Sequence, residues 1–213
     1  MKRVLLASLA LLATLASAAQ AQLVNFPVYA IPVGGEAPAT LVAGGWGRGL
    51  NDASGKMNSF GVAVGRTGIG GRGSALVGAN WIDFPVEAEY SFAGIGAVGV
   101  SVPESPTQIS VQAGIGYFGP ATDVSIWSIP IGIALAQNIA GESANFSIWG
   151  MPRVHLSRAS VLGTSSTETD FGGSAGFAVN LPSGLGLHTA FDILVSDPDN
   201  VTTFGVGVHY MIQ

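Results

Sequence analysis

Large apolar residues alternate with small or weakly polar residues along much of this chain, and the last stretch shows the pattern best. Phe204, Val206, Val208, Tyr210 and Ile212 fall on one parity, and the residues between them are Gly, Gly, His and Met. Because successive side chains of a β-strand point to opposite faces, this stretch predicts a strand with one broad apolar face and one small-residue face. Many such strands joined by short turns are typical of a transmembrane β-barrel, apolar toward lipid and small or polar toward the lumen.

The fold class that this pattern predicts is all-β: an antiparallel, transmembrane, up-and-down β-barrel of about ten strands. An even number of strands returns the C-terminus to the side of the membrane where the first strand begins. Merging or discarding two segments would give eight strands, which is the alternative. The longest predicted connection, residues 159–168, then falls on the outer side, and the tight turn at Pro182-Ser183 falls on the periplasmic side. The predicted strands are 40–50, 57–66, 73–83, 88–101, 107–118, 122–137, 144–158, 169–181, 184–195 and 201–213.

The start of the chain has the pattern of a secretory signal. Lys2 and Arg3 precede an apolar stretch that is too short to span a bilayer comfortably, and Ala19-Gln20-Ala21 is an A-x-A cleavage site. We therefore expect residues 1–21 to be a signal peptide that is cleaved after Ala21. Residues 22–38 contain three prolines and predict an irregular N-terminal lead-in, and residues 39–213 form the barrel.

Composition supports strands that face lipid. Charged residues make up 10% of the chain and the mean hydropathy is +0.47, whereas soluble domains carry roughly 25% charged residues. After the signal, no apolar run is long enough for a spanning helix. A soluble secreted β-barrel that binds a hydrophobic ligand inside is an alternative. It would need charged outward side chains, but the parity opposite the large apolar residues is rich in Gly, Ala and Ser.

Charge and residue types exclude several classes of function. Without Lys2 and Arg3, six basic residues remain against 13 acidic ones, so nucleic acid is not an expected partner. The chain has no cysteine, which excludes disulfides and thiolate zinc sites. The glycine-rich segment at 68–73 lacks the Lys-Ser/Thr of a phosphate loop. We expect no cofactor and no metal.

The signal, the alternation, the glycine-rich turns and the amphipathic last strand make residues 39–213 resemble small bacterial outer-membrane β-barrel proteins of eight to ten strands. The resemblance implies a location in the outer membrane of a Gram-negative cell, with outer-membrane lipid and the barrel-assembly machinery as partners. One departure is the ending Tyr210-Met211-Ile212-Gln213, because such proteins usually end in Phe or Trp.

The chain's candidate chemistry lies on the parity that faces the lumen. A charged group in the hydrocarbon zone is costly unless it faces a polar lumen or a partner. His188 and Asp192 lie about 13 Å apart along one strand, too far for direct contact, so no catalytic triad is placed. We expect a structural or conductance-tuning network and no catalytic residue. The lumenal set is Arg153, His155, His188, Asp192 and His209.

The predicted function is therefore non-enzymatic. The barrel would serve as a structural or surface scaffold, or as a porin-like narrow channel for small solutes. The remaining alternative is a barrel enzyme that acts on lipid or peptide, with a histidine as general base.

Overall fold

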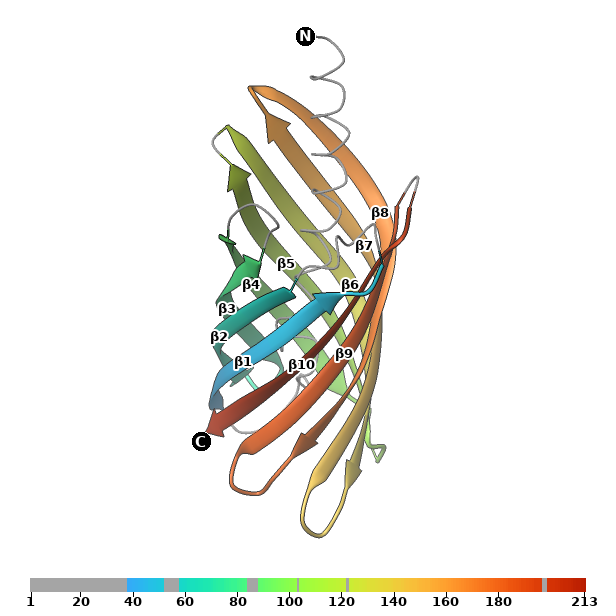
Figure 1. Cartoon of the computed structure of the whole chain (residues 1–213). Helices are drawn as coiled ribbons and strands as arrows, with labels where there is room; N and C mark the ends of the chain where they lie inside the picture. The colour runs from blue at the N-terminus through green and yellow to red at the C-terminus, as the bar shows by residue number, and fades with distance from the viewer. Residues whose placement is uncertain (1–37, 52–57, 84–87, 103, 122, 197–198) are drawn as a thin grey trace.

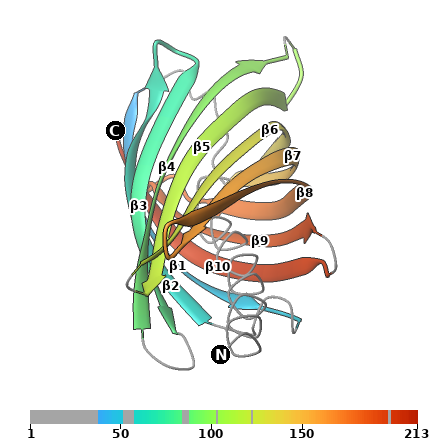
Figure 2. The same cartoon turned by 90° about the horizontal axis from the view of Figure 1, so that it is seen from above.

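The computed structural model describes residues 38–51, 58–83, 88–102, 104–121, 123–196 and 199–213. Ten antiparallel strands form one closed barrel in which each strand pairs with its sequence neighbours and β1 pairs with β10 (Figures 1 and 2). The prediction of ten strands is confirmed, and eight is not observed. The strands are β1 (Ala39–Gly49), β2 (Asn58–Ile69), β3 (Gly73–Asp83), β4 (Ala88–Ser101), β5 (Thr107–Ala121), β6 (Val124–Ala140), β7 (Asn145–Val161), β8 (Thr164–Asn180), β9 (Leu185–Val195) and β10 (Val201–Ile212).

The two ends of the barrel differ, and we name them as they lie in Figure 1. The lower rim holds the start of β1, the end of β10 and the connections β2–β3, β4–β5, β6–β7 and β8–β9. The upper rim holds the other hairpins. In the described residues, no helix is long and apolar enough to cross a bilayer. The predicted signal peptide and residues 22–37 of the predicted lead-in lie outside the described residues.

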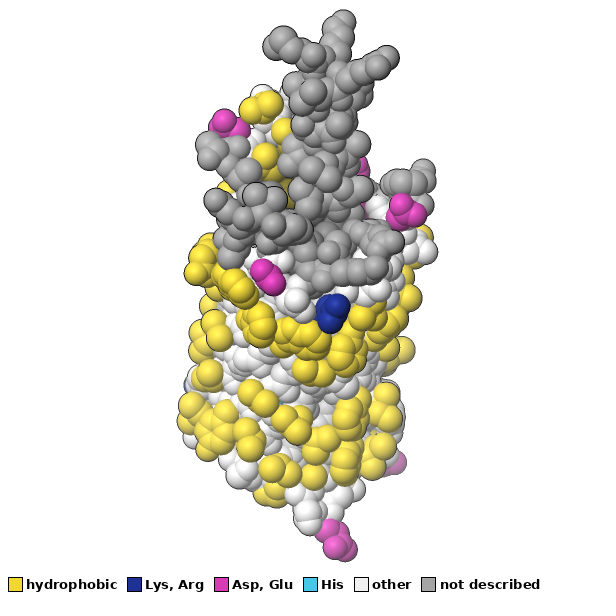
Figure 3. All heavy atoms as spheres, in the orientation of Figure 1, with side chains coloured by type: hydrophobic (Ala, Val, Ile, Leu, Met, Phe, Trp, Pro, Cys, Tyr) yellow, Lys and Arg dark blue, Asp and Glu magenta, His cyan; other side chains and the backbone are white. Residues whose placement is uncertain are grey.

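The large apolar parity points outward, as predicted. On β10, Val206 and Val208 are 41% and 51% exposed, whereas Thr203 and His209 on the other parity are buried. Figure 3 shows apolar side chains spread over the wall, with acidic side chains near its two ends. This arrangement is the reverse of a soluble barrel that holds a hydrophobic ligand inside.

An apolar layer crosses the barrel interior from wall to wall. Trp149 and Met151 of β7 are buried in one cluster with side chains from the opposite strands. The other buried members of this layer are Leu41, Ala43, Ala63, Leu76, Ile95, Ala134, Ala178 and Ala190.

Inward-facing glycines make room for this filling. A Cβ at Gly176 would lie 2.3 Å from Cζ2 of Trp149, the residue opposite on β7. A Cβ at Gly65 would lie 2.4 Å from Cγ of Leu76, the residue opposite on β3. Large side chains thus lie over the glycine of a neighbouring strand, and the glycine-rich parity encloses a packed interior rather than a wide lumen.

The prediction of a loop at residues 159–168 is wrong. β7 continues to Val161 and β8 begins at Thr164, and these two residues pair directly. Leu162 and Gly163 between them have φ of 49° and 80°, the left-handed pair of a two-residue hairpin turn. The tight turn before β9 is confirmed, with Gly184 at φ 87°.

The β7–β8 hairpin projects beyond the neighbouring strand at the upper rim. In the described residues, β9 pairs with β8 only from Phe171 downward, opposite Val195. Thr164–Asp170 therefore extends past the end of β9, and Figure 1 shows the hairpin above that part of the wall. The side chains of Thr164–Thr169 are exposed and mostly hydroxyl-bearing.

Candidate functional site

A buried ion pair joins β7 and β9 across the intervening strand. Arg153 forms a two-pronged contact with Asp192: Nη1 donates to Oδ1, and Nη2 donates to Oδ2 over 2.7 Å. The two side chains are 1% and 0% exposed. Gly172 lies opposite Arg153 on β8, between the two strands, and offers no side chain there.

Ser174 of β8 completes this ion cluster. Its Oγ accepts from Nη1 of Arg153 over 2.7 Å and donates to Oδ1 of Asp192 over 2.6 Å. A charged pair out of water is tolerated only where good geometry and added hydrogen bonds offset the loss of hydration. Ser174 supplies two of these added bonds, so the cluster links three neighbouring strands.

A second polar cluster, the histidine cluster, lies lower in the barrel on β8, β9 and β10. Nδ1 of His188 lies 3.2 Å from Nδ1 of His209, and Nε2 of His209 lies 2.6 Å from Oδ1 of Asn180. The amide oxygen can only accept, so Nε2 of His209 carries a proton. In neutral His209 the Nδ1 atom is then the acceptor, and Nδ1–H of His188 donates to it.

Each histidine ring of this cluster lies over the glycine that faces it on the next strand. A Cβ at Gly207 would lie 2.4 Å from Nε2 of His188, and a Cβ at Gly186 would lie 2.2 Å from Nε2 of His209. His188 of β9 is opposite Gly207 of β10, and His209 of β10 is opposite Gly186 of β9. The same histidine-over-glycine contact is therefore made once in each direction between the two strands. The glycines are therefore part of the cluster, because a larger residue would displace the rings.

His155 belongs to neither cluster. Its side chain is fully buried, and neither ring nitrogen has a hydrogen-bond partner in the described structure. Asp170 lies directly opposite on β8, is also buried, and has an unpartnered Oδ2. No three or more His, Asp or Glu side chains in the described part of the chain are grouped as a metal would require.

The structure thus divides the predicted lumenal set of five residues. Arg153 pairs with Asp192, His188 contacts His209, and His155 stands apart. The apolar layer separates the two clusters, since Ala190 lies between His188 and Asp192 on β9. All five side chains are buried inside the barrel as expected.

Sequence reasoning missed three partners, Ser174, Asn180 and Asp170. Each lies on the inward parity of the predicted strand 169–181, so the alternation that selected Arg153 also applied to them. What the sequence lacked was the register, which places Ser174 opposite Asp192 and Asn180 opposite Gly186.

Comparison with known proteins identifies the fold alone. No protein-family model matches the chain. No curated protein matches it either. Among solved structures, the chain is similar to the translocator domain of autotransporter NalP from Neisseria meningitidis, with a TM-score of 0.53 and 13% identity over 90% of this chain and 94% of that one.

Two other solved barrels are more distant. The N-terminal barrel domain of Pseudomonas aeruginosa OprF aligns with a TM-score of 0.39 and 10% identity over 82% of this chain and 97% of that one. Neisserial surface protein A aligns with a TM-score of 0.44 and 10% identity over 83% and 99%. The chain has the fold of small bacterial outer-membrane β-barrels, and no subfamily is established.

Proposed function

We propose that this protein is a non-enzymatic outer-membrane barrel that acts as a closed structural scaffold and presents its β7–β8 hairpin at the cell surface. The observation that carries the proposal is the filled interior. The apolar layer reaches from β1 to β9, and the ion cluster is buried above it. Among the described residues, these groups form a packed core. A channel would need a hydrated path at this position.

Placement in the outer membrane is part of this proposal. Its support is the outward apolar wall, the fold shared with solved outer-membrane barrels and the secretory pattern at the N-terminus. Lipid and the barrel-assembly machinery are the partners that such a placement implies. Small solutes become partners only under the channel alternative.

Sidedness follows from the hairpins. Outer-membrane barrels have short periplasmic turns and longer extracellular connections. The connection between β1 and β2 at the upper rim spans residues 50–57, whereas the four connections at the lower rim have three to five residues each. The β7–β8 hairpin has a short turn, but it projects beyond β9 at the upper rim. The upper rim is therefore proposed to face outward, with its hydroxyl-rich hairpin as the surface element.

Surface labelling tests the placement and its sidedness. An epitope inserted at Gly163, where a side chain would meet open space, should be stained on intact cells. A matched insertion after Ser183, in the lower turn, should be stained only after the outer membrane is permeabilised. The opposite result would invert the topology.

Electrical recording tests the closed interior. Purified wild-type protein in planar bilayers should give no steady single-channel current between about pH 5 and 8, the range in which histidines usually titrate. Steady channels that change on Arg153→Ala or Asp192→Ala would contradict the closed scaffold and support the narrow solute channel.

An enzyme that acts on lipid or peptide is the other alternative, and the observation that favours it is the unpartnered pair His155 and Asp170. Ser157 lies two residues from His155 on the same face of β7. Substrate has no access to a fully buried imidazole, which is why we rank this function lower. Hydrolysis of a phospholipid or peptide that His155→Ala abolishes would reverse that ranking.

A further inference from the structure

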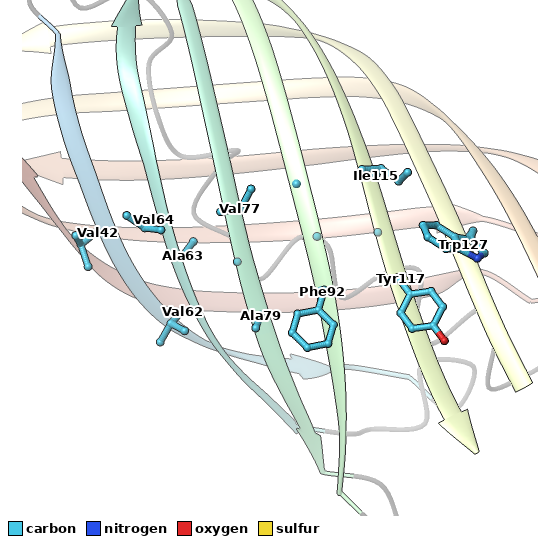
Figure 4. A pocket seen from close by; sticks show the side chains of 14 residues that line it. Val42, Val62, Ala63, Val64, Val77, Ala79, Phe92, Ile115, Tyr117 and Trp127 are labelled. Atoms are coloured by element: carbon cyan, nitrogen blue, oxygen red, sulfur yellow. The ribbon is translucent and has the colours of Figure 1, made fainter. Parts of the chain in front are cut away.

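The outer wall of the barrel is hollowed on one side. A groove of about 790 Å³ runs over β1–β6 and is lined almost wholly by apolar groups (Figure 4). We call it the outer groove, and the residues that matter here are Val64, Ala79, Phe92, Gly94, Tyr117 and Trp127. It lies on the face that the proposed membrane placement turns toward lipid.

The groove is hollow because small residues lie between large ones. Ala79 pairs with Phe92 across β3 and β4, and Gly94 has no side chain between Val77 and Ile115. A Cβ at Gly94 would make ordinary van der Waals contacts, with its nearest neighbours at 3.6 Å, so a side chain could occupy this position without a clash. The rings of Tyr117 and Trp127, with centroids 4.9 Å apart, border the same groove on β5 and β6.

A cation lies at the lower end of the outer groove. Arg66 is on the same outward face of β2 as Val64, two residues nearer the lower rim, and its side chain is exposed. Its Nη1 donates to Oγ1 of Thr40 over 3.2 Å, which holds the guanidinium against the wall. Of the outward-facing side chains described on β1–β5, none near this rim is acidic. The described strands therefore place no outward carboxylate beside Arg66, and the acidic residue described in the β4–β5 connection at this rim is Glu104.

We propose that the outer groove binds an acyl chain of an anionic phospholipid whose phosphate group contacts Arg66. Inside a bilayer there is no water to exclude from an apolar surface, so the hydrophobic effect does not hold a lipid against the wall. A lipid is held there by packing and polar contacts. A concave floor of Ala79 and Gly94 brings more wall atoms within contact of a chain than a flat wall would. Arg is suited to phosphate because its planar guanidinium can donate two parallel hydrogen bonds.

A second copy of the chain fits the outer groove less well. Two copies in one membrane are related by an axis along the membrane normal, which sets equivalent residues at equal depth. The two Arg66 side chains would then lie at the same depth in the interface between the copies, and these strands supply no acidic partner for either. An anionic headgroup supplies the missing negative charge.

The site rests on the membrane placement under Proposed function, so the two are tested separately. Flotation of the refolded protein with phosphatidylcholine vesicles tests the placement alone. A protein that does not float overturns both the placement and the lipid site. A protein that floats allows the lipid site to be tested in detergent by native mass spectrometry, with phosphatidylglycerol and phosphatidylcholine supplied in equal amounts.

Wild type should retain one phosphatidylglycerol in preference to phosphatidylcholine. Arg66→Gln should lower that preference about fivefold, the effect of one basic side chain near a membrane surface. Arg48→Gln, an exposed outward arginine toward the upper end of β1, is the matched control and should change nothing.

Filling the groove is the second variant. Gly94→Leu should abolish retention, whereas Gly173→Leu on β8, where a Cβ would also have its nearest neighbour at 3.6 Å, should not. Retention that neither Arg66→Gln nor Gly94→Leu lowers would overturn the proposal. A dimer that Gly94→Leu dissociates, with no lipid bound, would also overturn it and assign the groove to a second copy.

Discussion

The two halves of the barrel wall, β1–β5 and β6–β10, fill the interior with different kinds of side chain. On β1–β5, the described inward side chains are uncharged, and Leu41, Leu76 and Ile95 fill the space together with alanine and glycine. On β6–β10, the interior carries Arg153, Asp192 and the histidines. Both halves contribute to the apolar layer, since Trp149 and Met151 lie on β7, but the described buried charges lie on β6–β10. The uncharged half should therefore tolerate repacking better than the half that holds the ion pair.

The largest expected effect comes from separating the ion pair. Asp192→Ala leaves Arg153 charged and buried, and should lower the free energy of unfolding by about 3–5 kcal/mol. The double variant Arg153→Met, Asp192→Leu should recover most of that loss, because no charge is then left unpaired. Urea unfolding in lipid vesicles measures both, and Arg158→Ala, an exposed arginine of β7, is the control. Equal losses for the single and double variants would show that packing rather than charge sets the cost.

The next effect tests the outer face. Val206→Arg on β10 should cost about 2–4 kcal/mol of unfolding free energy if the residue lies near the bilayer midplane. Gly205→Ser on the inward parity of the same strand should cost much less. Similar losses in vesicle unfolding for the two variants would contradict the assigned faces.

A smaller effect tests the glycine contacts. Gly176→Ala should cost about 1–3 kcal/mol, because its Cβ would meet both the Trp149 ring and the carbonyl oxygen of Thr189 at 2.5 Å or less. Gly173→Ala on the outward face of the same strand should be nearly silent, since the nearest atom is 3.6 Å away. The heat-induced shift of gel mobility can rank the two variants. If Gly173→Ala lowered stability as much as Gly176→Ala, close packing of Trp149 over Gly176 would not be the cause of the loss.

The smallest effect sharpens the difference within the polar half. His155→Leu removes ring nitrogens that have no hydrogen-bond partner, so it should change the free energy of unfolding by less than about 1 kcal/mol. His209→Leu, which takes a partner from both His188 and Asn180, should cost more. The same vesicle unfolding assay compares them. A larger loss of unfolding free energy for His155→Leu than for His209→Leu would indicate that His155 has a hydrogen-bond partner inside the barrel.

Alternation alone was sufficient to predict the strand count and the inward direction of all five candidate residues. It could not predict which of them meet, because contacts across a barrel depend on register. Arg153 reaches Asp192 only because β8 places Gly172 and Ser174 between them. The hairpin at Leu162-Gly163 was missed for a local reason: leucine rarely adopts a positive φ, so Gly163 alone did not indicate a two-residue turn.

If the upper rim faces outward as proposed, the projecting end of β8 meets neighbouring molecules at the cell surface. Among the described residues, no strand pairs with β8 beyond Val195 of β9, so the backbone of Thr164–Asp170 is a sheet edge that could recruit a strand from a neighbouring molecule. Glu168 is exposed on this edge, and charge is a common means by which proteins prevent such pairing. The exposed carboxylate of Glu168 would then oppose aggregation by keeping adjacent barrels from pairing edge to edge.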